Sequence, residues 1–300
     1  MRRRRLVTIA GSGRLAAAMS GALLRRGGVR IAIAARNPRA ARDLARRRPG
    51  ASVVPWSALG AARVLLLAVP DDAIAPVARE IARLAKSFEG TVVLHAAGAL
   101  GVEPLSPLAR RGASTGVLHP LAVLGRSGAE RLEGAAARIE GAPRAVRAAR
   151  AIARSAGLRP LPDAPFTTGA ARADYHAAAS LAANDVLGLL DAARAILVRR
   201  GIGARAATRA LASLARGVVD QMEAHGTRGA LTGPAARGDA RTLARHLESL
   251  ARYDPDIADA HRALSRRLAR VAREAGELSP SAARALAAIL RRGPRRERAV

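Results

Sequence analysis

Apolar runs alternate with helix-like segments through the first half of this 300-residue chain. The runs cover residues 4–10, 29–35, 63–69, 91–96, 114–119 and 137–141, and a last short run covers 158–162. Between them, helical patterns cover 14–26, 38–47, 71–85 and 143–155, with a shorter candidate at 102–111. Continuous apolar strands that alternate with helices are typical of a parallel sheet covered on both faces. The alternation therefore predicts an α/β fold, a doubly wound, mostly parallel Rossmann sheet.

The second half of the chain has a different pattern. The Pro-marked stretch "PLPDAP", residues 160–165, ends the alternation, and no strand pattern follows it. The Ala-rich segments after it favour helix. We expect helices at 167–200, ended by Gly201, and at 203–223, 239–252, 254–275 and 279–291, before a frayed basic tail. The chain is thus predicted to hold an α/β domain over 1–162 and an all-α domain over 163–300.

The first strand and the first helix are joined by "GSGRLA", residues 11–16. Gly11, Gly13 and Ala16 fit the pattern G-x-G-x-x-G/A, in which they allow a tight turn, close approach of a pyrophosphate, and close packing of helix on strand. The anion then binds free amides at the helix N-terminus. A strand before the motif and a helix after it favour dinucleotide binding over a simple tight corner. The residues expected to bind the cofactor here are Gly11, Ser12, Gly13, Arg14, Leu15 and Ala16.

The end of the second strand, "AIAARNP", bears on which dinucleotide is bound. An Asp or Glu about twenty residues after the motif favours NAD, because its carboxylate binds the ribose 2′-hydroxyl. This chain has Arg36 instead and no acid nearby, and a guanidinium can pair with the 2′-phosphate of NADP. We therefore predict NADP, with NAD as the alternative because Arg is abundant throughout the chain. Asn37 and Pro38 are expected to begin the next helix.

Residues that follow the strands are further candidates, because doubly wound sheets bind ligands beyond the carboxyl ends of their strands. Asp71 is expected to cap the helix that follows the run at 63–69. His95 and His119 each end a strand, and each is either a hydrogen-bonded, half-buried histidine or a member of the site. The strand-end residues expected to contact the cofactor are Val69, Pro70 and Gly98.

The basic charge does not favour nucleic acid as a specific partner. The formal net charge is +28, but Lys86 is the only Lys, and the Arg residues are scattered along the chain rather than gathered in one patch. Aromatic residues, on which single-strand binders stack bases, make up only 2% of the chain. An Arg-driven nucleic-acid binder is therefore kept only as a minor alternative.

Three further classes of feature are not expected. The chain has no Cys, so it holds neither a disulfide nor a thiol nucleophile. No close cluster of His, Asp and Glu has the spacing of a metal site. No apolar run is long enough to cross a bilayer, and the short run in "MRRRRLVTIA" is interrupted too early for a signal sequence. We expect a cytoplasmic protein without a membrane partner.

Six segments together resemble a bacterial family of oxidoreductases whose reaction is poorly characterised. They are "IAGSGRLAAAM", "LLLAVPDDAI", "HAAGALG", "GVLHPLA", "YHAAASLAAND" and "LTGPAARGD". That family joins a Rossmann-like domain to a helical domain of unassigned function, within the 6-phosphogluconate-dehydrogenase-like superfamily, near ketopantoate reductase and pyrroline-5-carboxylate reductase. The resemblance covers roughly residues 5–290. It implies a homodimer in which the long helix packs against its partner, so that residues 163–300 serve substrate binding and dimerisation.

The long helix expected at 167–200 supplies candidate catalytic residues. His176, Ser180 and Asn184 recur at every fourth position and would share one helix face. Relatives in the superfamily place a Lys and an Asn on the equivalent helix; here Arg172 replaces the Lys, and Arg cannot release a proton near neutral pH. This implies His176 as the general acid and Asn184 as the group that orients the carbonyl, with Arg172 and Ser180 as substrate contacts. The alternative is a helix–helix contact whose polar atoms are satisfied locally.

The loop "LTGPAARGD", residues 231–239, precedes a helix for which Asp239 is the expected N-cap. Thr232 is expected to approach the substrate, and Arg237 to clamp a substrate carboxylate. The alternative is a tight turn without a binding role.

The expected function is reduction of a small keto- or imino-carboxylate with NADP, and ketopantoate is the leading substrate. Three departures from the family pattern weaken the catalytic side of this expectation. Ala97 and Ala183 stand where Ser is common, and Arg172 stands where Lys is usual. Each change removes a polar group from the expected site. A catalytically weak or inactive protein that binds or senses NADP(H) is therefore the alternative.

Overall fold

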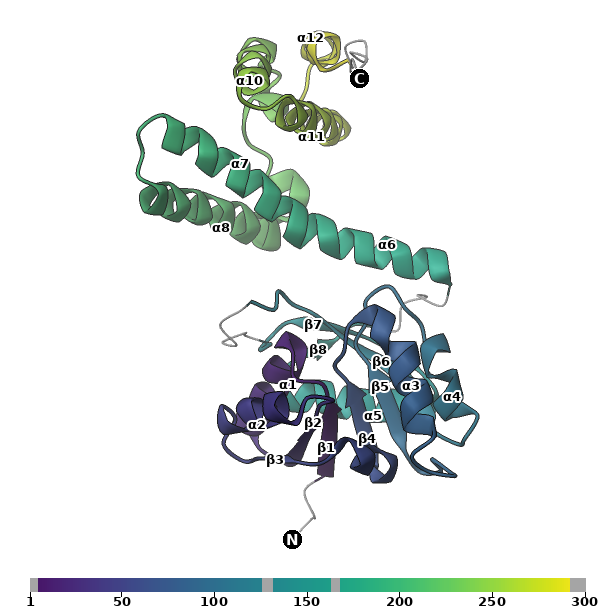
Figure 1. Ribbon diagram of the computed structural model, residues 1–300. Helices are drawn as coiled ribbons and strands as arrows, with labels where there is room; N and C mark the ends of the chain where they lie inside the picture. The colour runs from purple at the N-terminus through teal and green to yellow at the C-terminus, as the bar shows by residue number, and fades with distance from the viewer. Residues whose placement is uncertain (1–4, 126–131, 163–167, 292–300) are drawn as a thin grey trace, which may run out of the picture. The chain divides into compact units, whose positions relative to one another are not determined.

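The computed structural model describes residues 5–125, 132–162 and 168–291 (Figure 1). The chain divides into two compact units, residues 1–183 and 184–300. This division comes later than the boundary expected after residue 162, because helix α6 (Gly169–Ser180) belongs to the first unit, where Arg172 and Tyr175 are buried. The stretch at 163–167, in which the domain boundary was expected, and the tail beyond residue 291 lie outside the described residues.

The first unit is built on an eight-stranded sheet with the order β3-β2-β1-β4-β5-β6-β7-β8. Strands β1 to β6 are parallel, β7 is antiparallel to β6, and β8 is parallel to β7. This confirms the doubly wound, mostly parallel sheet, whose order reverses between β1 and β4. The strands are β1 (Arg5–Ala10), β2 (Val29–Ala34), β3 (Ala51–Val53), β4 (Val64–Leu67), β5 (Val92–His95), β6 (Ser114–Leu121), β7 (Ala136–Gly141) and β8 (Arg159–Pro160).

Helices cover the sheet on both faces, as Figure 1 shows. Strand β4 contributes Val64 and Leu66 to one apolar cluster and Leu65 and Leu67 to the other, so it is buried on both sides. This explains why it reads as a continuous apolar run. The first cluster includes α1 (Arg14–Arg26), α2 (Pro38–Arg46) and α5 (Pro143–Ser155). The second includes η1 (Trp56–Ala61), α3 (Ile74–Ala82) and α4 (Ser106–Ala109).

Three local features differ from the sequence-based prediction. Strand β3 was not expected, because it is a three-residue edge strand whose Ser52 and Val53 are exposed and leave no apolar run. The helix expected at 71–85 begins as a 3-10 turn, η2 (Asp71–Ala73), and ends at Ala82. The shorter candidate at 102–111 is a 3-10 turn, η3 (Glu103–Leu105), followed by the single turn of α4.

The described residues of the second unit contain helices and no strand, as expected. Helices α9 to α12 pack around an apolar core that includes Leu243, Leu247 and Leu286. The helices are α7 (Val186–Arg199), α8 (Ala204–Gly229), α9 (Pro234–Arg237), α10 (Ala240–Tyr253), α11 (Pro255–Glu274) and α12 (Pro280–Leu290). The expected end of α7 is confirmed, since Gly201 has a φ of +89°, which favours Gly after a helix.

Candidate functional site

The turn between β1 and α1 lies where the strand order reverses. The Gly11 amide donates to the Ala34 carbonyl of β2 over 2.8 Å, and the Ala68 amide donates to the Ala10 carbonyl over 2.8 Å. Gly11 has a φ of +138°, and a methyl group on it would lie 2.2 Å from the Ala68 carbonyl oxygen. Only Gly fits this close approach of two strand ends. The structure thus gives Gly11 the tight-turn role that the motif assigns to it.

Gly13 is the N-cap of α1 and leaves the helix N-terminus open. No side chain caps this end, and the first turn carries no acidic residue. A methyl group on Gly13 would meet no atom within 4 Å, whereas Ala16 is fully buried under the helix. An uncapped N-terminus with free space beside it has the donors and the partial positive charge that a phosphate needs. The residues present therefore fit a dinucleotide pyrophosphate, and the individual cofactor contacts at 11–16 stay predictions.

Arg36 follows β2, as expected, but its guanidinium already has a partner. Arg36 Nη2 donates to Glu80 Oε2 of α3 over 2.8 Å, and its Cζ lies 5.8 Å from the centre of the Trp56 ring. The same carboxylate accepts a hydrogen bond from Trp56 Nε1 over 2.7 Å. More than half of the Arg36 side chain is exposed, so donors remain for a phosphate. The sequence analysis missed Glu80 and Trp56, because nothing local links them to Arg36. The next helix begins as expected, with Asn37 accepting from the Arg39 amide.

Val69 and Pro70 follow Ala68, the residue after β4 that lies against Gly11, and they stay predicted cofactor contacts. The expectation that Asp71 caps the following helix is wrong. Asp71 lies inside the 3-10 turn η2, and neither η2 nor α3 has a side-chain cap. The reason is that the chain turns into η2 immediately after Pro70, so that Asp71 is already in the first turn rather than before it.

His95, the last residue of β5, is a structural histidine. It is fully buried, its Nε2–H donates to the Gly101 carbonyl over 2.6 Å, and its Nδ1 accepts from the Ala97 amide over 3.1 Å. The Ala97 amide can only donate, so this pair of bonds requires the neutral ring with its proton on Nε2. Burial lowers the pKa of His95 below its usual value, which favours the same neutral form. Both ring nitrogens are thereby occupied in shaping the loop from Ala97 to Gly101.

His119 of β6 lies at the same edge and is joined to helix α6. Its Nδ1 lies 2.9 Å from the Tyr175 hydroxyl, and the two rings meet edge to face. A methyl group on Gly98 would lie 2.9 Å from His119 Nε2 and 2.7 Å from His176 Nδ1. Two imidazole nitrogens therefore converge on Gly98. Burial, together with the Arg138 and His176 charges, lowers the pKa of His119 to about 4, so the ring is neutral near pH 7.

A buried ion-pair network holds α6 against the sheet. Arg138 of β7 is only 1% exposed, and its guanidinium pairs with Glu140, donates to the Leu100 carbonyl over 2.8 Å and lies over the Tyr175 ring. Arg172 of α6 pairs with the other oxygen of Glu140 over 2.6 Å and with Glu103 over 3.2 Å. The hydrogen bond to Glu140 raises the pKa of Arg172, while burial lowers that of Arg138. One carboxylate thus serves as the shared counter-ion of two guanidinium groups.

This network was missed by the sequence analysis, although a weak signal existed. Arg138 and Glu140 are charged residues two apart in a strand, so they lie on the same face, where one can neutralise the other. Arg172 was expected to contact substrate, and its guanidinium is instead engaged by Glu140 and Glu103. The substrate role of Arg172 stays a prediction. It requires the substrate to share this guanidinium with the carboxylates of Glu140 and Glu103.

The other expected substrate residues are divided between the units. Ser180 ends α6, whereas Asn184, Thr232 and Arg237 belong to the second unit. Residues 181–185 form a π-helical segment, η4 (Leu181–Asp185), and a π turn is wider than an α turn. The expectation of one uninterrupted α-helical period from His176 to Asn184 is therefore wrong. Asp239 caps α10 as expected, by accepting from the Thr242 amide.

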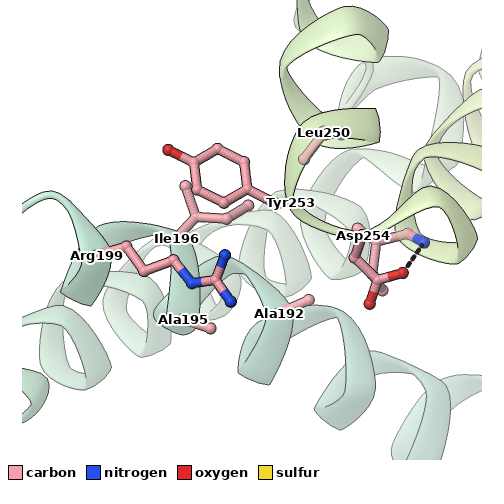
Figure 2. A pocket seen from close by; sticks show the side chains of 8 residues that line it. Ala192, Ala195, Ile196, Arg199, Leu250, Tyr253 and Asp254 are labelled. Atoms are coloured by element: carbon pink, nitrogen blue, oxygen red, sulfur yellow. Dashed lines mark hydrogen bonds between the residues drawn. The ribbon is translucent and has the colours of Figure 1, made fainter.

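A small cavity in the second unit is not a candidate for the cofactor. It lies between α7 and the junction of α10 with α11 and measures about 100 Å³ (Figure 2). Arg199 lies over the Tyr253 ring at 5.5 Å, and Asp254 accepts hydrogen bonds from the Asp256 and Ile257 amides. Small-molecule sites usually measure about 300–1,000 Å³, so this volume suits a few water molecules.

The described part of the chain offers no candidate for a metal site or a membrane span. No three side chains of His, Asp or Glu come together there as metal ligands would. None of the helices described combines the length and the apolar character that crossing a bilayer requires.

Two family models match successive parts of the chain, and the second match begins within the first unit. Residues 1–120 match the model of a Rossmann-like domain. Residues 135–268 match the model of a domain of unknown function, DUF2520. The expected union of a Rossmann-like domain with a helical domain of unassigned function is thereby confirmed. No functionally curated protein matches the chain.

Solved structures with the same fold are distant in sequence. A protein from Thermotoga maritima is 20% identical, with a TM-score of 0.70 over 89% of this chain and 99% of its own. A reductive aminase from Aspergillus terreus, in complex with NADPH and ethyl levulinate, is 18% identical, with a TM-score of 0.61 over 94% and 98%. An imine reductase from Streptomyces aurantiacus is 19% identical, with a TM-score of 0.60 over 94% and 99%. At such identities the likeness concerns the fold.

Proposed function

We propose that this protein is an NADP-dependent oxidoreductase that reduces a small keto- or imino-carboxylate, with ketopantoate as the leading substrate. One observation carries the proposal. Gly13, at the open N-terminus of α1, follows β1, and Gly98, which the imidazoles of His119 and His176 approach, follows β5, so both lie at the carboxyl edge of one sheet. Structures of the same fold include a reductive aminase in complex with NADPH.

Each group in the proposal has a chemical role. When bound, NADPH supplies a hydride to the electrophilic carbon of the substrate. The turn at Gly11 to Ala16 holds the pyrophosphate, and Val69, Pro70 and Gly98 line the cofactor. His176 donates a proton to the substrate heteroatom, and Asn184 orients the carbonyl. The further substrate contacts proposed are Arg172, Ser180, Thr232 and Arg237.

We also propose that the protein is a cytoplasmic homodimer whose contact includes the long helix expected at 167–200 and, after it, α8. Leu214 is 68% exposed, and Val218, Val219 and Met222 are also more than half exposed. Their spacing places them along one stripe of α8. A stripe of exposed apolar side chains is typical of a surface that a partner covers.

Arg36→Ala is expected to change cofactor preference rather than dinucleotide binding in general. Loss of a charge-assisted contact with the 2′-phosphate should weaken NADPH binding by about 10- to 100-fold. Binding of NADH, which lacks this phosphate, should stay within about twofold because no contact is lost. Calorimetric titration of both dinucleotides checks this. Arg42→Ala, which removes an equal charge from the exposed side of α2, is the control. Equal weakening of both dinucleotides would contradict the role.

The enzyme assignment is tested by NADPH oxidation with a panel of keto- and imino-carboxylates that includes ketopantoate. We expect turnover by the parent protein and a loss of about 100-fold in His176→Ala, typical for removal of a general acid. Unchanged turnover in His176→Ala would refute the acid assignment. Binding of NADPH without oxidation by any substrate would favour the alternative, a sensor that lacks turnover. That alternative is consistent with Ala97, which stands where Ser is common. Its backbone carbonyl accepts from Arg138 and its amide donates to His95, but its side chain has no polar group.

A further inference from the structure

The side chains around His119 bear on which chemical group of the substrate is reduced. A methyl group on Gly98 would come within 2.9 Å of His119 Nε2 and 2.7 Å of His176 Nδ1, so both rings lie close against this residue. Among the described residues, no hydrogen bond to His119 Nε2 is present, whereas Nδ1 is joined to Tyr175. A ring nitrogen at the carboxyl edge of the sheet that lacks a hydrogen bond, while its opposite nitrogen is fixed, is arranged to meet a ligand.

The pairing with Tyr175 sets which nitrogen of His119 carries the proton. A phenol is a good donor, and the lone pair of an imidazole nitrogen is a much better acceptor than a phenol oxygen. The Tyr175 hydroxyl therefore donates to Nδ1, and the remaining ring proton lies on Nε2. Arg138 is the register partner of His119 on β7, and its positive charge opposes protonation of the ring. His119 is thus a neutral donor at the open edge.

The charges around His119 discriminate between substrates. Among the described residues, the charged groups that shift the pKa of His119 are Arg138, His176 and His95, and none of them is a carboxylate. Asp71 acts on His95, and Glu140 is neutralised by Arg138 and Arg172. An iminium cation would find no counter-anion beside His119 in the described part of the chain, and it has no lone pair to accept Nε2–H. A carbonyl oxygen accepts that bond, and it accepts more strongly as negative charge develops during reduction.

We propose that the group reduced is a carbonyl rather than an imine, that His119 Nε2–H donates to its oxygen, and that Tyr175 is the positioning residue that sets this tautomer. The proposal rests on the proposed reductase function. In the step, the hydride from NADPH forms a C–H bond with the carbonyl carbon, and the π electrons of C=O move to oxygen. The oxygen takes a proton from His176, and NADPH becomes NADP⁺. His119 keeps its proton and stabilises the oxygen.

The first test compares two probes of similar size, 2-oxoisovalerate and 1-pyrroline-2-carboxylate, with NADPH and the full-length protein. We expect the oxo acid to be reduced at least about tenfold faster. His119→Leu should lower kcat for it by about 100-fold, as removal of an oxyanion donor does. His119→Gln, whose amide N–H lies near the position of Nε2, should recover part of this loss. His225→Leu, on the exposed side of α8, is the matched control.

The second test measures the tautomer of the His119 ring by NMR and does not depend on turnover. In protein labelled with ¹⁵N-histidine, ring shifts that disappear in His119→Gln belong to His119, and we expect the Nε2–H pattern. Tyr175→Phe should shift the population toward Nδ1–H and lower kcat while leaving NADPH affinity unchanged. An Nδ1–H tautomer in the parent, or a faster imine reaction that is insensitive to His119, would overturn the inference. Failure to bind NADPH would instead overturn the proposed function, and the tautomer measurement would still judge the His119–Tyr175 pair.

Discussion

Gly13→Asp should abolish most dinucleotide binding while leaving the protein folded. The carboxylate would occupy the open space at the N-cap of α1 and oppose a pyrophosphate at close range. We expect the Kd for NADPH to rise by at least about 100-fold, roughly 3 kcal/mol. The fold should tolerate the change, since Gly13 has a φ of −77° and Asp is a good N-cap. Calorimetric titration with NADPH measures the effect.

The matched control for this variant is Gly203→Asp. Gly203 is the N-cap of α8 in the other unit, has a negative φ and also has no atom within 4 Å of an added methyl group. The Gly203→Asp variant therefore adds the same charge at the same helical position but leaves the turn between β1 and α1 unchanged. Equal NADPH affinity in Gly13→Asp and the parent would remove the dinucleotide site from α1. Equal losses in both variants would show a general effect of charge.

Glu140→Gln is expected to destabilise the first unit by about 3–5 kcal/mol, because it leaves two guanidinium groups without their shared counter-charge. Arg138 is buried, and its Nε already lacks a hydrogen-bond partner among the described residues. Arg172 keeps its longer contact with Glu103 but loses the shorter ion pair with Glu140. The urea concentration at the midpoint of unfolding should fall in proportion to this loss of stability, because the surface exposed on unfolding is unchanged. Trp56, the only Trp, lies in the first unit and reports its unfolding by fluorescence.

Glu133→Gln is the control for this measurement. It breaks the ion pair with Arg26, whose two side chains are 69% and 46% exposed. Exposed pairs contribute about 0–1 kcal/mol, so the midpoint should barely move. If Glu140→Gln unfolds at the same urea concentration as Glu133→Gln, the network at Glu140 is not what holds α6 on the sheet.

Much of the first unit could be predicted because its signals are local. A strand buried on both faces has to be apolar throughout, as β4 is, and this leaves a readable pattern. The Gly11 turn could be predicted for the same reason, since a positive φ and a close backbone approach both require Gly at that residue. Strand β3 could not be predicted, because an exposed three-residue edge strand carries no apolar period. The π segment at 181–185 likewise leaves no distinct pattern among Ala-rich residues.

The sequence by itself determined the alternation of strands and helices, the glycine turn between β1 and α1 and the presence of a basic residue after β2. Only the tertiary structure decided which charged groups meet. Glu80 reaches Arg36 from 44 residues away, and Tyr175 reaches His119 across 56. The spacing of apolar residues in a helix or strand indicates which face of the element is buried. It does not indicate which side chain of another element a charged residue will meet. Pairing between distant side chains depends on strand order and register, which exist only once the chain has folded.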